Sequence, residues 1–254
     1  MTNKEMLCTA LKQSALELNC TVDDLTGGKS KAVISSTAEG ARKYLSLPFY
    51  CQLVSYGSGI VASVNEEIYA DAEAYIEKYA PEHCFETPNM LVLQSALERR
   101  GMSACFMAEY WLCDTDAIRM IDCGYELRLL TAEDFAPLYT PQWSNALCEK
   151  RKELDVLGIG AYDGEKLVGL AGCSADCESM WQIGVDVLPE YRRRGIASAV
   201  TGRLAAEIMA RGKVPFYCCA WSNVASARNA IRAGFRPVWV ELTAKSAEYT
   251  ADMN

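Results

Sequence analysis

Apolar residues in the first half of the chain follow helical and strand-like spacings in turn. Between residues 4 and 19, apolar side chains from Met6 to Leu18 recur on one stripe, which predicts an amphipathic helix. Short apolar runs bounded by turn residues then predict strands, and two later segments return to helical spacing. The predicted strands are Ala32–Ser35, Tyr50–Tyr56, Gly59–Val64 and Ser103–Cys113, and the predicted helices are Glu66–Tyr79 and Pro88–Arg99. We therefore predict a smaller N-terminal α/β domain over residues 1–124.

The pattern changes near residue 124, where shorter strands and tight turns begin. Thr131 and Asp134 form a capping box that predicts a helix start, and a second helix is predicted over Ser144–Lys152. Asp163-Gly164 is typical of the turn of a β-hairpin. The predicted strands are Tyr125–Leu130, Val156–Tyr162, Leu167–Cys173, the run from Trp181 to Val187, and Val214–Ala220, and further helices begin at Ile196 and after Asn223. These elements predict a second domain over residues 125–254.

Composition narrows the class of protein. Half of the 254 residues are hydrophobic and 23% are charged, as in an ordinary globular protein. The net charge of −8 argues against a protein that coats nucleic acid or an anionic membrane, because both need an electropositive face. No apolar run approaches the roughly 18 residues of a membrane span. The beginning of the chain also lacks the continuous apolar core of a signal peptide.

Cysteine and histidine usage bears on metal sites and on the compartment. The chain has 12 cysteines, none in a CxxC pair, and a single histidine, His83. These spacings match no zinc site, so we predict no metal. We interpret the cysteines as reduced residues of a cytoplasmic protein, because disulfides are rare in that compartment. One histidine also disfavours Ser-His-Asp and Cys-His mechanisms.

The clearest chemical signal is the sequence RRRG at 192–195, between a strand and a helix. Three cations at a helix N-terminus oppose the helix dipole, which favours an anion there by roughly 0.3–1 kcal/mol. Free N–H groups of the first helical turn, a glycine and flanking guanidinium groups together can hold a diphosphate. The alternative interpretation is a solvated run of charges.

Two motifs in this region resemble those of a known family. The sequence RRRGIA at 192–197, after a strand ending in VLP at 187–189, resembles the acyl-CoA signature Gln/Arg-x-x-Gly-x-Gly/Ala of the GNAT N-acetyltransferase superfamily. NVAS at 223–226 and GF at 234–235 resemble its second motif. The resemblance covers residues 125–242. The sequence around the second motif is also similar to that of the FR47-like and zwittermicin-resistance-type subgroup, which carries an extra N-terminal region.

The resemblance implies a fold and a co-substrate. The expected fold is α/β (α+β): a C-terminal GNAT fold with a mixed, mostly antiparallel sheet flanked by helices, plus the smaller N-terminal domain. In this superfamily the fourth strand diverges from the fifth, and the pantetheine arm of acetyl-CoA lies in the gap. The backbone of Val185 and Val187 would bind that arm. Gly184 would form a bulge and present its N–H to the thioester carbonyl.

The resemblance also implies which residues hold the rest of acetyl-CoA. The diphosphate would be held by Arg192, Arg193, Arg194, Gly195, Ile196, Ala197 and Ser198. Asn223 would reach the pantetheine side, and Ser226 would lie near the sulfur. For Asn223 a simple helix N-cap that accepts the Ser226 N–H is an equal alternative.

The sequence departs from the superfamily at both proton-transfer positions. A strand carboxylate found in many members is replaced here by Trp181, and a tyrosine that protonates the sulfur is replaced by Ala230. Asp186, acting through water with Glu178 behind it, is the candidate general base, although a surface carboxylate is the slightly favoured alternative for each. Ser226 is the candidate hydrogen-bond partner of the thiolate.

Three functions follow from the resemblance. The first is an N-acetyltransferase that moves an acetyl group from acetyl-CoA to a primary amine of a small molecule, by direct attack in a ternary complex. The second keeps this chemistry but acetylates a protein or peptide, with residues 1–124 as a docking surface or a degenerate second half. The third is a non-catalytic acyl-CoA-binding module. The sequence allows a homodimer.

Overall fold

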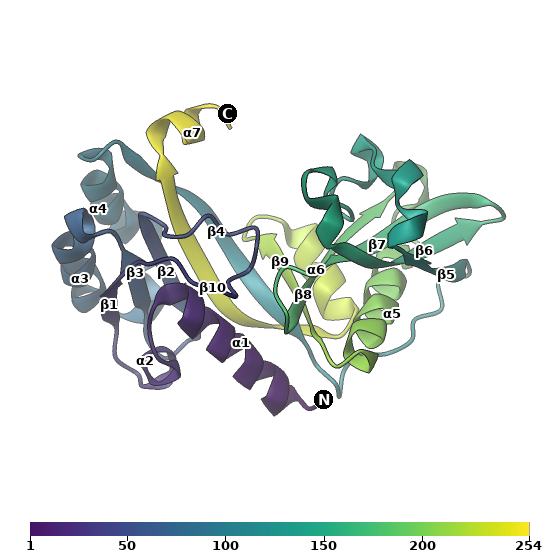
Figure 1. The fold of residues 1–254 in the computed structure, drawn as a ribbon, viewed down its shortest axis with the longest axis horizontal. Helices are drawn as coiled ribbons and strands as arrows, with labels where there is room; N and C mark the ends of the chain where they lie inside the picture. The colour runs from purple at the N-terminus through teal and green to yellow at the C-terminus, as the bar shows by residue number, and fades with distance from the viewer. Residues whose placement is uncertain (254) are drawn as a thin grey trace. The chain divides into compact units, whose positions relative to one another are not determined.

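Two long strands, β4 (Met102–Cys113) and β10 (Phe235–Ser246), each begin in one unit of the chain and end in another. The computed structural model describes residues 1–253 (Figure 1). The first unit comprises Met1–Thr9 and Trp111–Pro237, and the second comprises Ala10–Tyr110 and the chain from Val238 onward. The division therefore differs from the boundary predicted near residue 124. Both strands continue across the junction, so the end of a strand does not mark where the chain leaves a unit.

The second unit is a sheet with the strand order β1-β3-β2-β10-β4 and helices packed on it. Its other strands are β1 (Lys31–Ile34), β2 (Cys51–Ser55) and β3 (Val61–Val64), and its helices are α2 (Val22–Thr26), α3 (Tyr69–Lys78), α4 (Thr87–Glu98) and α7 (Ala247–Ala251). Helix α1 (Asn3–Leu18) begins in the first unit and ends in this one. Short 3-10 helices occupy Glu66–Ile68 and Pro81–His83. The predicted helices and strands of residues 1–113 are confirmed.

One face of this sheet is apolar and the other carries buried charge. Leu53 and Leu242 belong to the apolar core beneath α3 and α4. Gln52 and Glu241 alternate with them along the strands and so lie on the opposite face. There Arg42 is buried and reaches Glu241 at 2.9 Å.

The first unit is a sheet with the strand order β4-β9-β8-β7-β6-β5. Its strands are β5 (Glu126–Thr131), β6 (Asp155–Asp163), β7 (Lys166–Ser174), β8 (Met180–Val187) and β9 (Val214–Ala220), and its helices are α5 (Ile196–Ala210) and α6 (Val224–Arg232). Strands β5 to β8 pair antiparallel, whereas β8 and β9 pair parallel. Gly164, with φ +60°, forms the predicted turn between β6 and β7. The mixed, mostly antiparallel sheet that was expected is confirmed.

The two helices predicted between β5 and β6 are not α-helices. The region instead holds short 3-10 helices at Ala132–Asp134, Ala136–Leu138, Pro141–Trp143 and Glu149–Leu154, and another at Pro189–Tyr191 follows β8. The capping box of Thr131 and Asp134 is present. Pro137 has no N–H for an α-helical bond, and Thr140 before Pro141 is extended, so a continuous α-helix does not run through either position.

Helix α5 lies against strands β6 to β9 of the first unit. Gly169 on β7 allows this approach, because a Cβ there would collide with Ile196 at the start of the helix. The N-terminus of α5 is thereby held close to the sheet. Within residues 1–253, none of the helices combines the length and the apolar character needed to cross a lipid bilayer.

Candidate functional site

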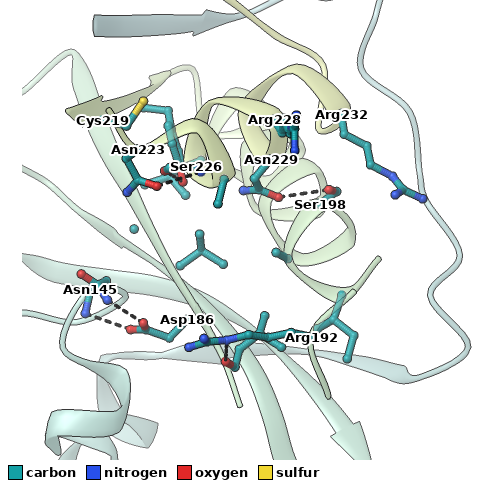
Figure 2. Close-up of a pocket in the computed structure, with 18 of the residues that line it drawn as sticks. Asn145, Asp186, Arg192, Ser198, Cys219, Asn223, Ser226, Arg228, Asn229 and Arg232 are labelled. Carbon is teal, nitrogen blue, oxygen red and sulfur yellow. Dashed lines mark hydrogen bonds between the residues drawn. The ribbon is translucent and has the colours of Figure 1, made fainter. Parts of the chain in front are cut away.

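A pocket of about 760 Å³ opens in the first unit where β8 and β9 separate (Figure 2). The two strands pair only from Met180, opposite Val214, to Gln182, opposite Phe216. Beyond these residues the strands diverge, and α5 and α6 supply the rest of the wall. The sequence candidates that line the pocket are Gly184, Val185, Asp186, Val187, Arg192, Arg193, Gly195, Ile196, Ala197, Ser198, Asn223 and Ser226. The divergence expected from the resemblance is thus present between these strands.

The backbone of β8 presents peptide groups to this gap. The Leu188 N–H donates to the Val168 carbonyl at 3.0 Å, on the β7 side. Because peptide groups alternate along a strand, those of Val185 and Val187 point away from β7 and into the gap. These are the two residues whose backbone was expected to bind an extended ligand arm.

The expectation for Gly184 is wrong in its physical reason. Gly184 pairs with Gly172 in an unbroken register, so there is no bulge, and the same alternation turns its N–H toward β7. A Cβ at Gly184 would collide with the backbone oxygen of Asn145, and one at Gly172 with that of Ala146. The two glycines therefore make room for the segment Asn145–Ala146 to cross the strands.

Asp186 holds this crossing segment in place. Its Oδ2 accepts the backbone N–H groups of Asn145 at 2.8 Å and Ala146 at 3.0 Å, and its Oδ1 accepts the Asn145 side-chain amide at 2.7 Å. Figure 2 shows Asp186 and Asn145 together on one side of the pocket. With three donors bound, the Asp186 carboxylate positions the pocket wall, which does not favour the general-base role expected for it.

The loop before α5 has the backbone geometry of an anion site. Arg193 and Gly195 both adopt left-handed conformations, with φ +64° and φ +83°. Such a conformation costs a non-glycine residue roughly 1–2 kcal/mol, and it curves successive N–H groups toward one point. No side chain caps α5, and its first intrahelical bond runs from the Ala199 N–H to the Gly195 carbonyl. The N–H groups of the first turn therefore remain available to a ligand.

Four exposed arginines surround this loop. Arg192 and Arg193 come from the loop itself, and Arg228 and Arg232 come from α6, one turn apart. No ion pair with a carboxylate is found for any of the four within residues 1–253. Arg192 donates instead from Nε to the Val187 carbonyl at 3.1 Å. This arrangement suits a ligand with several phosphate charges.

Two corrections concern which arginines face the pocket. Arg194 does not line it, because its guanidinium donates to the Tyr125 hydroxyl at 2.7 Å and lies over the ring of Tyr191. Arg228 and Arg232 do line it but were missed by the motif analysis. Their spacing of four residues on a strongly amphipathic helix, shortly after the Asn223 motif, is a signal that could have found them.

The facing side of the pocket carries hydroxyl and amide groups from β9, α5 and α6. Asn223 caps α6 by accepting the Ser226 N–H at 3.1 Å, as the N-cap interpretation predicted. Ser226 Oγ lies 2.6 Å from the hydroxyl of Tyr217, which sequence analysis treated only as part of a strand. Asn229 accepts from the Ser198 hydroxyl at 3.0 Å (Figure 2). Burial raises the pKa of Tyr217, so this phenol stays protonated at neutral pH.

The remaining candidates lie outside the pocket. Glu178 is exposed and does not line it, and neither does Trp181. Ala230 is fully buried. Among residues 1–253 no cluster of three or more His, Cys, Asp or Glu side chains is placed to hold a metal ion.

These features fit a ligand with a polyphosphate at one end and a long arm with amide groups at the other. Backbone amides of α5 and the four arginines suit the phosphates. The peptide groups of Val185 and the N–H of Val187 suit the arm, whereas the Val187 carbonyl is bonded by Arg192. The arm would end near the point where β8 and β9 meet, beside Tyr217. Coenzyme A and its thioesters have this constitution.

Comparison with known proteins agrees with this ligand. The sequence model of the family "GNAT acetyltransferase" matches residues 103–239, more than half of the chain. Among curated proteins the comparison found no match.

Solved structures with a similar fold include several GNAT proteins. A GNAT-family protein from Novosphingobium aromaticivorans is 21% identical with a TM-score of 0.41; the match covers 57% of this chain and 66%, just under two thirds, of that one. A GCN5-related N-acetyltransferase from Sphaerobacter thermophilus is 16% identical with a TM-score of 0.48, and the match covers 74% of this chain and 72% of that one. The protein yncA from Salmonella typhimurium, solved with its cofactor acetyl-CoA, is 17% identical with a TM-score of 0.34, covering 48% and 93%.

Proposed function

The chain belongs to the GNAT acetyltransferase family, and from this premise we propose that it transfers the acetyl group of acetyl-CoA to a primary amine of a small molecule. The observation that carries the proposal is the gap between β8 and β9, which leads from the anion site at α5 to a hydroxyl cluster. Direct attack of the amine within a ternary complex needs no residue to form a covalent intermediate.

The phosphates would be held at the exposed end of the pocket. The first-turn N–H groups of α5 would donate to the diphosphate, with Gly195 allowing close approach. Arg192, Arg193, Arg228 and Arg232 would supply the positive charge around it. The peptide groups of Val185 and Val187 would bond the pantetheine arm and so direct the thioester toward Gln182 and Tyr217.

The amine would approach along the wall formed by Asn145–Ala146. A primary amine has an ordinary pKa near 10.4 and must lose a proton before it attacks. Asp186 is committed to the wall by three hydrogen bonds. We therefore assign Asp186 the positioning of this wall and assign the acceptance of the amine's proton to solvent. Ser226 would donate a hydrogen bond to the sulfur as the thiolate leaves.

Thiol release from acetyl-CoA tests the proposal. The purified chain would be incubated with acetyl-CoA alone, with a panel of small primary amines and with a panel of peptides bearing free N-termini and lysines. Release that depends on one class of small amine, with the acetylated product found by mass spectrometry, supports the proposal. Release with peptides alone supports the protein acetyltransferase instead.

A second function, a non-catalytic acyl-CoA-binding module, is favoured by one observation. Asp186 is the single carboxylate among the described residues that line the pocket, and its oxygens are already bonded. Such a module would bind CoA, measured by calorimetry, and release no thiol with any amine. Turnover with any acceptor excludes this alternative.

A further inference from the structure

Tyr217 lies at the closed end of the gap between β8 and β9. It directly follows Phe216, the last residue of β9 that pairs with β8. Its ring is only 3% exposed, yet it forms part of the pocket wall. From the α5 end, the strand from Val187 back to Ile183 measures roughly 13 Å at about 3.3 Å per residue. A ligand arm that follows β8 from the anion site to the closed end of the gap therefore reaches Tyr217.

The Tyr217 side chain reaches across to α6. Its hydroxyl lies 2.6 Å from Ser226 Oγ, in the first turn of that helix. Ser226 and Ala230 are four residues apart and so share one face of α6. The phenol of Tyr217, which comes from β9, therefore lies against the face of α6 on which Ala230 contributes only a methyl group.

We infer that Tyr217 and Ser226 together form the hydrogen-bond donor that stabilises the thiolate as it leaves. The inference rests on the proposed acetyl transfer. Two hydroxyls that share one hydrogen bond hold two hydrogens, of which one joins the pair and one remains for a ligand. Asn229 uses no hydrogen of the pair, because its carbonyl accepts from Ser198 at 3.0 Å and its amide donates to Thr201 at 3.1 Å. That amide also bonds Tyr217 in the sense that lowers the phenol pKa.

The balance of the step identifies the pair as a donor and not as an acid that gives up its proton. Breaking the C–S bond leaves the electron pair on sulfur, while the amine nitrogen loses its proton to solvent. A thiol has an ordinary pKa near 8.5 and a phenol one near 10, so the proton stays on oxygen. Burial raises the pKa of Tyr217 further, which keeps the donor intact through neutral and mildly alkaline pH. Tyr217 keeps its hydrogen and polarises Ser226, which touches the sulfur.

The kinetic test uses two deletions of a hydroxyl and a matched control. Tyr217→Phe and Ser226→Ala each remove one positioned donor, and each is expected to lower kcat about 10–100-fold. KM for acetyl-CoA is expected to change by less than about twofold. Tyr75→Phe removes an equally buried hydroxyl, bonded to the Cys84 carbonyl outside the pocket, and is expected to leave kcat unchanged. A fall in kcat of less than about twofold in Tyr217→Phe overturns the inference.

A more acidic phenol at position 217 distinguishes a hydrogen-bond donor to the sulfur from a side chain that only packs in the fold. Replacement of Tyr217 by 3-fluorotyrosine lowers the phenol pKa, so the alkaline limb of kcat is expected to move to lower pH with it. A purely packing role predicts an alkaline limb that does not move. If the alkaline limb of the kcat–pH profile does not move, the result contradicts the donor role, even if Tyr217→Phe has a low kcat.

A binding measurement keeps the inference separate from the proposed function. The rate at which bound CoA is alkylated by iodoacetamide, followed on CoA itself by mass spectrometry, reports the pKa of its thiol against pH. A donor to the thiolate lowers that pKa below the value for free CoA, and Tyr217→Phe restores it. If no amine supports turnover but Tyr217→Phe raises the thiol pKa of bound CoA, the result contradicts the proposed acetyl transfer and supports the donor role of Tyr217. If turnover occurs and the thiol pKa of bound CoA is the same with and without the Tyr217 hydroxyl, the result supports acetyl transfer and contradicts the donor role of Tyr217.

Discussion

Arginine serves opposite purposes in the two units. In the first unit Arg192, Arg193, Arg228 and Arg232 are exposed around a helix N-terminus and have no carboxylate partner among the described residues. In the second unit Arg42 is buried and bonded to Glu17 at 2.7 Å and Glu241 at 2.9 Å. Burial and pairing decide between the two outcomes: a neutralised guanidinium joins elements of the fold, whereas an unneutralised one attracts an anion.

The buried cluster is held by more than one pair. Glu241 also accepts from the Trp239 indole at 2.8 Å and from the Gln52 amide at 3.2 Å. Arg42 belongs to the irregular segment between β1 and β2. Its contacts therefore join that segment to α1 through Glu17 and to β10 through Glu241. The cluster contributes to stability, and we assign it no ligand.

The largest expected effect comes from breaking this cluster. Arg42→Ala leaves two carboxylates buried without their cation, so the free energy of unfolding is expected to fall by about 3–5 kcal/mol. Urea denaturation followed by tryptophan fluorescence measures this change. Lys31→Ala breaks the exposed pair with Asp24 and is expected to leave the urea midpoint nearly unchanged. Equal effects of the two variants would contradict the importance assigned to burial.

The next effect concerns the anion site. Gly195→Val adds a side chain where the first-turn N–H groups must approach phosphate, and it removes the left-handed conformation that φ +83° requires. Loss of two charge-assisted hydrogen bonds is expected to weaken CoA binding at least about 100-fold, measured by calorimetry.

Gly212→Val is the matched control for Gly195→Val. Gly212 has φ +72° at the other end of α5 and does not line the pocket. It imposes a similar backbone strain, so it is expected to lower stability while keeping CoA affinity within about twofold. Equal loss of affinity in both variants would mean that strain in α5, and not access to its N-terminus, controls binding.

A smaller effect is expected from the arginines of α6. Arg228→Gln with Arg232→Gln removes two exposed charges and is expected to weaken CoA binding about 10-fold, or 1.4 kcal/mol, at low salt. The loss should shrink as ionic strength rises, because exposed charges are screened. Arg203→Gln, whose side chain pairs with Glu207 on α5, is expected to change neither quantity. Calorimetry at two salt concentrations measures the CoA affinity and its salt dependence. A loss of affinity that does not change with salt would indicate that these arginines act in folding.

The last effect, a change of slope with pH, concerns a buried carboxylate of the first unit. Burial raises the pKa of Asp155 to about 6, partly offset by the Cys148 N–H at 2.8 Å. The folded chain therefore binds this proton more tightly than the unfolded chain, whose ordinary value is near 3.9. Its contribution to stability is full below about pH 4 and is lost as pH rises through 6.

Substitution of Asp155 tests that sign. In Asp155→Asn the fall in unfolding free energy between pH 4 and 6.5 is expected to be shallower than in the unsubstituted chain, by less than about 1.4 kcal/mol per pH unit. Urea denaturation across this range gives the slope. A steeper fall in Asp155→Asn would contradict the assigned direction of the pKa shift.

The amino-acid sequence by itself determined the features that depend on neighbouring residues. Apolar periodicity located the strands other than β10, and the helices α1, α3, α4 and α5, because a helix or strand buries one face at a fixed spacing. The motif that begins at Asn223 located α6, and β10 was missed. The run RRRG at 192–195 located the proposed anion site, since a positive φ at Gly195 and a helix start are both local properties. Where local signals conflicted, as at Pro137 and Pro141, the expected helices shortened into 3-10 turns.

Only the tertiary structure decided which distant side chains meet. The early end of β8–β9 pairing opens the gap, and it brings Tyr217 of β9 to Ser226 of α6. The same packing turns Arg194 away toward Tyr125 and brings in Arg228. Asp186 reads as an exposed strand residue in the sequence, yet it holds a segment some forty positions earlier. Partners of this kind depend on strand register and on how elements pack, which no spacing within one segment encodes.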